Sequence, residues 1–166
     1  YEVLDWLYAN VTNFSYENCA YGGLLKDYGI MRRSFKIQSI DIYTPLDNHC
    51  GFYDSLYAFP AAQVSGVLSS GSGNQKYWFR SASMGAARIE PDPMGWTQQE
   101  KDDCAAAVST YKTKIRPLIR TANVYHIFQR PDDTVWTGMQ FHDPDSGKGV
   151  VYVFRPNNPS NTYTVK

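Results

Sequence analysis

Apolar residues recur with helix-like and strand-like periods in turn over the N-terminal quarter of the chain. Helical spacing predicts one helix over residues 1–10 and another over residues 24–33. Strand-like alternation predicts strands over residues 13–19 and 35–42, with a glycine-rich break at Tyr21–Gly23. The second of these strands is apolar on both faces, which is typical of a parallel sheet buried between layers of helices.

Two sequence patterns mark helix starts further along. Thr44 followed by Pro45 and Asp47 predicts a capping box and a helix that runs to about residue 61. Thr97 and Glu100 form a second capping-box pattern, which opens a long helix through residue 119.

The remaining segments are predicted to be mostly strands. A Gly/Ser-rich loop spans residues 68–74, and a third strand is expected within residues 77–89. After residue 123, short apolar runs over residues 124–128, 134–141 and 149–154 are separated by Asp/Pro/Gly turns. That spacing is typical of antiparallel hairpins.

This order predicts an α/β fold: the C-terminal portion of a TIM (β/α)8 barrel with about three βα units, followed by antiparallel strands of a β-sandwich domain. We therefore divide the chain into residues 1–122, the barrel part, and residues 123–166, the start of the β-domain. Three strands cannot close a barrel, so we expect a fragment or a chain completed by a partner.

Composition excludes more than it identifies. The 166 residues carry 16 basic and 16 acidic side chains, so a net charge of zero gives no electrostatic footprint for nucleic acid or an anionic membrane. No apolar run approaches the roughly 20 residues of a membrane-spanning helix. Three cysteines are too few for a disulfide framework. Aromatic residues make up 15% of the chain, which suits sugar rings and protein interfaces alike.

Two motifs are more specific. Tyr16–Gly23 reads Y-E-N-C-A-Y-G-G and resembles the E-N-C-A-S-G-G motif of glycoside hydrolase family 36, the melibiase-type α-galactosidases. The segment from Arg32 to Asp47 resembles that family's R-R-S…S-D…P-L-D block and aligns with it without a gap. Similarity to the family's last barrel strand and helix and to its β-domain extends over nearly the whole chain.

The resemblance implies roles for three residues. The family's catalytic acid/base corresponds to Asp41, and the residues that contact bound galactose correspond to Cys19 and Gly22. The family's nucleophile is an aspartate in a K-W-D-type motif on an earlier strand, and this sequence contains no such motif. We therefore expect a retaining α-galactosidase fragment that carries the acid/base, lacks the nucleophile and is inactive alone.

The same resemblance implies the ligands. The expected substrate is a galactosyl oligosaccharide, and no cofactor or metal is expected. Because unpaired barrel strands tend to associate, we expect either self-association or pairing with the N-terminal half of a barrel. The sequence indicates no compartment.

Residue chemistry supports the role of Asp41. Retaining glycosidases use two carboxyl groups roughly 5 Å apart, one as nucleophile and one as proton donor. Asp41 follows a predicted barrel strand at the end where catalytic groups gather, and Ile40 and Ile42 predict apolar surroundings. Cys19 ends the preceding strand, and its glycine neighbours allow a ligand to approach the backbone closely.

Other polar residues have simpler explanations. Asp47 is expected to be structural because the capping box accounts for it, and Glu17 is expected to form an ion pair inside the barrel. A catalytic thiol at Cys19 would need His126 or His142 as its base, and neither histidine lies in a motif. His49–Cys50 lacks metal-ligand spacing, and the turn at residues 143–147 lacks the length and closing glutamate of a calcium loop.

Two functional alternatives stay open. One is a neighbouring specificity on the same fold, either an α-N-acetylgalactosaminidase or a transglycosylase that makes raffinose-type sugars. The other is a carbohydrate-binding pseudoenzyme, which the changes from the family pattern around Asp41 keep open.

Overall fold

The computed structural model describes residues 1–41, 44–68 and 74–165. Its first sheet has four parallel strands in the order β1-β2-β3-β4. They are β1 (Glu17–Asn18), β2 (Lys36–Gln38), β3 (Val64–Leu68) and β4 (Ala86–Ile89). Its second sheet is antiparallel, in the order β5-β6-β7. These strands are β5 (Asn123–Tyr125), β6 (Thr137–Asp143) and β7 (Lys148–Phe154).

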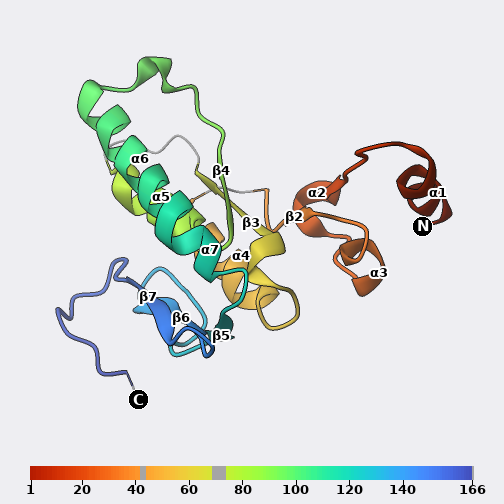
Figure 1. Cartoon of the computed structure of the whole chain (residues 1–166). Coiled ribbons are helices and arrows are strands. Elements are labelled where there is room, and N and C mark those ends of the chain that lie inside the picture. The colour runs from red at the N-terminus through yellow and green to blue at the C-terminus, as the bar shows by residue number, and fades with distance from the viewer. Residues whose placement is uncertain (42–43, 69–73, 166) are drawn as a thin grey trace.

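Helices follow the parallel strands, as in a (β/α) barrel. The longer ones are α4 (Pro45–Ser55), α5 (Gln75–Ala82) and α6 (Gln98–Thr110), and α6 continues through a π-helical turn (Tyr111–Ile115) into α7 (Arg116–Leu118). The N-terminal helices are α1 (Glu2–Asn10), α2 (Ala20–Gly23) and α3 (Tyr28–Met31), and short 3-10 turns span Ala61–Gln63 and Pro93–Gly95. Figure 1 shows α1, α2 and α3 standing apart from the body that the other helices form around the sheet.

A shared core joins the two sheets. Phe52 of α4 is fully buried against the outer face of the parallel sheet, next to Gly66 of β3. The same cluster of buried residues reaches Phe141 and Tyr152 in the antiparallel sheet. The Tyr152 hydroxyl donates a hydrogen bond of 2.9 Å to the Ser83 carbonyl after α5. Burial of such aromatic side chains stabilises the fold by roughly 1.5–3 kcal/mol each.

The fold class predicted from the sequence is confirmed, as are both capping boxes and the antiparallel hairpins. The long helix beginning at Gln98 is also present. None of the helices in the described ranges is both long and apolar enough to cross a membrane.

The strand prediction for residues 77–89 was wrong in its first half. Residues 75–82 form α5, because the Asn74 side chain caps the helix by accepting from the Tyr77 amide. Phe79 and Ala82 then point into the core at helical spacing. The aromatic run Tyr77–Phe79 that suggested a strand lies within this helix, and of its three residues only Phe79 is buried.

One strand was not predicted. All five residues of β3 are buried, so the segment shows no alternation between apolar and polar positions. It raises the number of parallel strands in the described structure to four. The other strands and helices of the N-terminal part are shorter than predicted, and α4 ends at Ser55. Ile42 and most of the predicted Gly/Ser loop lie outside the described residues.

Candidate active site

The candidate site lies where β1 and β2 end. The two strands pair in parallel, with Asn18 opposite Ile37, so their carboxyl ends meet at one edge of the sheet. Cys19 directly follows β1, and Asp41 follows β2 by three residues. Both side chains are exposed. In barrels of this kind the carboxyl ends of the strands carry the reacting groups.

A left-handed turn follows Cys19. Ala20, Tyr21, Gly22 and Gly23 all have positive φ angles, from 40° to 85°. The turn is closed by the Gly23 amide, which donates to the Cys19 carbonyl at 2.6 Å. A left-handed conformation costs a residue with a Cβ roughly 1–2 kcal/mol, so Ala20 and Tyr21 are strained. Strain of this kind clusters at functional sites.

The turn brings the first motif against Asp41. A Cβ on Gly22 would lie 2.6 Å from the Asp41 backbone nitrogen and 3.0 Å from its carboxyl carbon. A Cβ on Gly23 would overlap the Gln38 carbonyl at the end of β2. Only glycine fits both positions, and the structure brings Gly22 and Asp41 together.

The immediate contact of the Asp41 carboxylate is polar. The Gln38 amide donates from Nε2 to Asp41 Oδ1 at 2.9 Å. Ile40, expected to make these surroundings apolar, packs instead toward α4, near Gly51. Ile42, the other residue on which the expected apolar setting rests, lies outside the described residues, so that expectation stays a prediction.

Ion pairs cross the sheet beside Asp41. Arg88 of β4 donates to Glu17 of β1 at 3.1 Å and also pairs with Glu90. Glu17 additionally pairs with Lys36 of β2 at 3.2 Å. The prediction that Glu17 forms an ion pair is confirmed. Arg88 donates to Gln38 Oε1 at 3.1 Å, which connects this network to Asp41.

Sequence reasoning missed Gln38, Arg88 and Lys26. Lys26 donates from Nζ to the Ser39 carbonyl at 2.6 Å, and burial lowers the pKa of its amine. The available signal was the alternation of polar Lys36 and Gln38 around apolar Ile37, which marks a polar inner face on β2.

The competing roles considered for other residues gain no support. His126 Nε2 lies 2.9 Å from the Tyr53 carbonyl, and its ring stacks on Tyr57, so it belongs to a cluster at α4. Asp47 completes the capping box with Thr44. Within residues 1–41, 44–68 and 74–165, no three His, Cys, Asp or Glu side chains gather in a way that could hold a metal ion.

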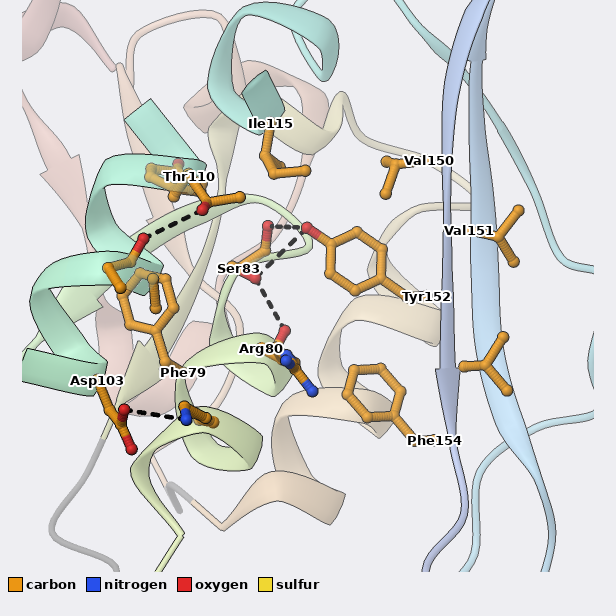
Figure 2. A pocket seen from close by; sticks show the side chains of 15 residues that line it. Phe79, Arg80, Ser83, Asp103, Thr110, Ile115, Val150, Val151, Tyr152 and Phe154 are labelled. Carbon is orange, nitrogen blue, oxygen red and sulfur yellow. Dashed lines mark hydrogen bonds and ion pairs between the residues drawn. The ribbon is translucent and has the colours of Figure 1, made fainter. Parts of the chain in front are cut away.

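One cavity lies away from the three predicted site residues. A hollow of about 500 Å³ is lined by α5, α6 and β7, and Asp41, Cys19 and Gly22 do not line it. Figure 2 shows the Tyr152 ring pointing from β7 toward Ser83 in this hollow. Asp41 is exposed at the edge of a sheet whose four strands do not surround a barrel interior.

No protein-family model matches the chain. The chain is similar to the probable α-galactosidase G of Emericella nidulans, with 26% identity over 163 residues that cover 93% of this chain and 22% of that protein.

Solved structures share the fold. The galactosidase domain of the α-galactosidase–sucrose kinase AgaSK gives a TM-score of 0.86 at 19% identity, over 99% of this chain and 24% of that one. A variant of AgaA, a family 36 α-galactosidase from Geobacillus stearothermophilus solved with raffinose, gives 0.84 at 20% identity, over 93% of this chain and 22% of that one.

The fold is that of part of a glycoside hydrolase barrel followed by strands of a β-domain. More particularly, the chain resembles a region of the α-galactosidases, in sequence those of fungi and in fold those of glycoside hydrolase family 36. It spans about a fifth of the length of the curated relatives that it matches.

Proposed function

We propose that this chain forms part of a retaining α-galactosidase, with Asp41 as its acid/base and with Cys19 and Gly22 shaping the sugar pocket. The observation that carries the proposal is the close approach of Gly22 to Asp41 at the ends of two adjacent parallel strands. The sequence similarity to α-galactosidases over 93% of the chain supports it. In this proposal residues 1–122 belong to the barrel and residues 123–166 begin the β-domain.

The chemistry assigns two successive tasks to Asp41. Its carboxyl group first donates a proton to the glycosidic oxygen while a second carboxylate attacks the sugar, which forms a glycosyl-enzyme. The Asp41 carboxylate then accepts a proton from water, and that water releases the galactose. The exposure of Asp41 fits both steps, because the leaving group and the water must reach it.

The second carboxylate would come from outside these 166 residues, since the sequence contains no K-W-D-type motif. The remainder of the barrel would pair with β1 and β4, which are the edge strands of the parallel sheet. Galactosyl oligosaccharides are the proposed substrates, because a structural neighbour was solved with raffinose.

A matched pair of proteins tests this proposal. A polypeptide that joins this region to the rest of a barrel should hydrolyse 4-nitrophenyl α-galactoside, and the 166-residue chain alone should not. Hydrolysis by the isolated chain at an enzymatic rate would overturn the proposal that the nucleophile lies outside these 166 residues. Absence of hydrolysis by the longer polypeptide, together with binding of galactose, would favour a carbohydrate-binding pseudoenzyme.

Competition between sugars tests the specificity. An acetamido group at carbon 2 would need room beside Cys19 and Gly22, where the turn packs closely on Asp41. Galactose should therefore inhibit more strongly than N-acetylgalactosamine. The reverse order would favour an α-N-acetylgalactosaminidase. Transfer of galactose to sucrose in preference to water would instead favour the transglycosylase.

A further inference from the structure

Gln38 is the polar side chain in direct contact with Asp41. It lies at the end of β2, is only 3% exposed, and donates from Nε2 to Asp41 Oδ1 at 2.9 Å. The same nitrogen donates to the Ile40 carbonyl at 3.2 Å. Both amide hydrogens are therefore directed at the segment that carries the acid/base.

Arg88 fixes the orientation of the Gln38 amide. Its Nη2 donates to Gln38 Oε1 at 3.1 Å. A guanidinium group can donate hydrogen bonds but cannot accept them. Reversal of the amide would therefore set its NH2 group against the Arg88 donors and its oxygen against the Asp41 carboxylate. The observed orientation satisfies both partners.

Arg88 is itself held from both sides. It pairs with Glu17 on β1 and with Glu90 after β4, and Glu17 also pairs with Lys36 on β2. The side chains of Arg88 and Glu17 are 25% and 31% exposed, so water screens these pairs only in part. Through Arg88, the position of Gln38 is tied to Glu17 on β1 and to Glu90 after β4.

We propose, on the basis of the function proposed above, that Gln38 is a positioning residue for Asp41 and that Arg88 acts through it. The amide hydrogen bond occupies Oδ1, and the carbonyl oxygen is the stronger acceptor of a protonated carboxyl group, so this bond favours Oδ1 as the carbonyl oxygen. The catalytic proton is therefore carried on Oδ2. Gln38 selects the oxygen that faces the leaving group and limits rotation of the carboxyl group.

The test compares leaving groups in the polypeptide that contains the complete barrel. Proton donation matters most for a poor leaving group such as methanol and least for a good one such as 4-nitrophenol. Gln38→Met keeps the length and burial of the side chain but removes the amide. We expect kcat/KM on methyl α-galactoside to fall about tenfold more than on 4-nitrophenyl α-galactoside, a part of the 100- to 10,000-fold typical of general acid catalysis.

Lys36→Met is the matched control. Lys36 lies on the same strand and joins the same network, but it pairs with Glu17 rather than with Gln38 or Asp41. Lys36→Met should change kcat/KM on both substrates by the same factor. Gln38→Asn, which shortens the amide side chain by one methylene group, should show the selective loss if Gln38→Met fails to fold.

Three results separate the possibilities. A selective loss in the Gln38 variant with no selective loss in Lys36→Met supports the positioning role. An equal loss on both substrates, or no loss, overturns it and assigns Gln38 to structure alone. If Asp41→Asn shows the selective loss while the Gln38 variants do not, the proposed function stands and the positioning role fails. If wild type hydrolyses neither substrate, both are wrong.

Discussion

Gly22 lies against Asp41 so closely that a Cβ on the glycine would come within 2.6 Å of the aspartate's backbone nitrogen. The two residues are 19 positions apart in the sequence and belong to different motifs. Their contact depends on the parallel pairing of β1 and β2 and on the left-handed turn after Cys19. The first motif is therefore part of the environment of the residue proposed as acid/base.

Substitution of Gly22 by alanine should lower the free energy of unfolding by more than its left-handed backbone conformation alone accounts for. Gly147 has nearly the same φ, 67° against 66°, but no neighbouring atom lies within 4 Å of an added Cβ. Gly147→Ala should lower the free energy of unfolding by about 1 kcal/mol, from the left-handed conformation only. Gly22→Ala should lower it by about 2–4 kcal/mol, because the Cβ also displaces Asp41. Urea denaturation of both variants measures the difference, and equal losses would contradict the close packing.

Cys19 should be the most reactive thiol in the chain. It is exposed, whereas burial raises the pKa of the Cys50 and Cys104 thiols and so reduces their thiolate fraction. Iodoacetamide labelling followed by peptide mass spectrometry should find Cys19 modified first. If Cys19 borders the sugar pocket, galactose should slow its labelling in the complete-barrel polypeptide, and glucose at equal concentration should not. Equal labelling rates with both sugars would show that Cys19 does not border the sugar pocket.

Asp47 should affect stability and leave catalysis intact. Its carboxylate accepts from the Thr44 amide at 3.3 Å and completes the capping box of α4. Asp47→Ala should lower the free energy of unfolding by about 1 kcal/mol. Glu100→Ala, which breaks the equivalent box at α6, is the matched control and should have a similar effect. A large fall in kcat for Asp47→Ala alone would show that this carboxylate takes part in the reaction.

His49 should make the fold sensitive to acid. The residue is 2% exposed, and the centroid of its ring lies 4.0 Å from that of the Phe154 ring. Burial lowers the pKa of His49 from 6.5 to about 3. Below pH 6.5 the unfolded histidine binds a proton that the folded one excludes until about pH 3. As the pH is lowered from 6.5 to about 3, the free energy of unfolding should therefore fall by up to about 1.4 kcal/mol per pH unit. In His49→Phe this part of the slope should disappear, and unchanged slopes in urea denaturation at several pH values would contradict it.

The local signals in the sequence were sufficient for much of the fold. Thr44 and Thr97 mark the starts of their helices in the sequence because a capping box is confined to four residues. The hairpin strands are marked by the Asp/Pro/Gly turns between them, which are local in the sequence. The strand β3 is buried on both faces and gives no alternation. Periodicity alone cannot assign such a short apolar segment.

In the candidate site, too, local sequence patterns predict some residues and leave out contacts that only the fold creates. Asp41, Cys19 and Gly22 lie in motifs that can be compared with a known family. The contact between Gln38 and Arg88 joins residues 50 positions apart. It exists only because β2 and β4 flank β3 in one sheet, an arrangement that no local pattern specifies.

The central claim is that Asp41 donates the proton to the leaving group. The most direct measurement compares wild type with Asp41→Asn in a polypeptide containing the complete barrel, using 4-nitrophenyl α-galactoside and methyl α-galactoside. We expect kcat/KM on the methyl glycoside to fall by about 100-fold or more and that on the nitrophenyl glycoside to fall far less, because 4-nitrophenol departs without a proton. Equal losses on the two substrates, or full activity in the variant, would contradict the account.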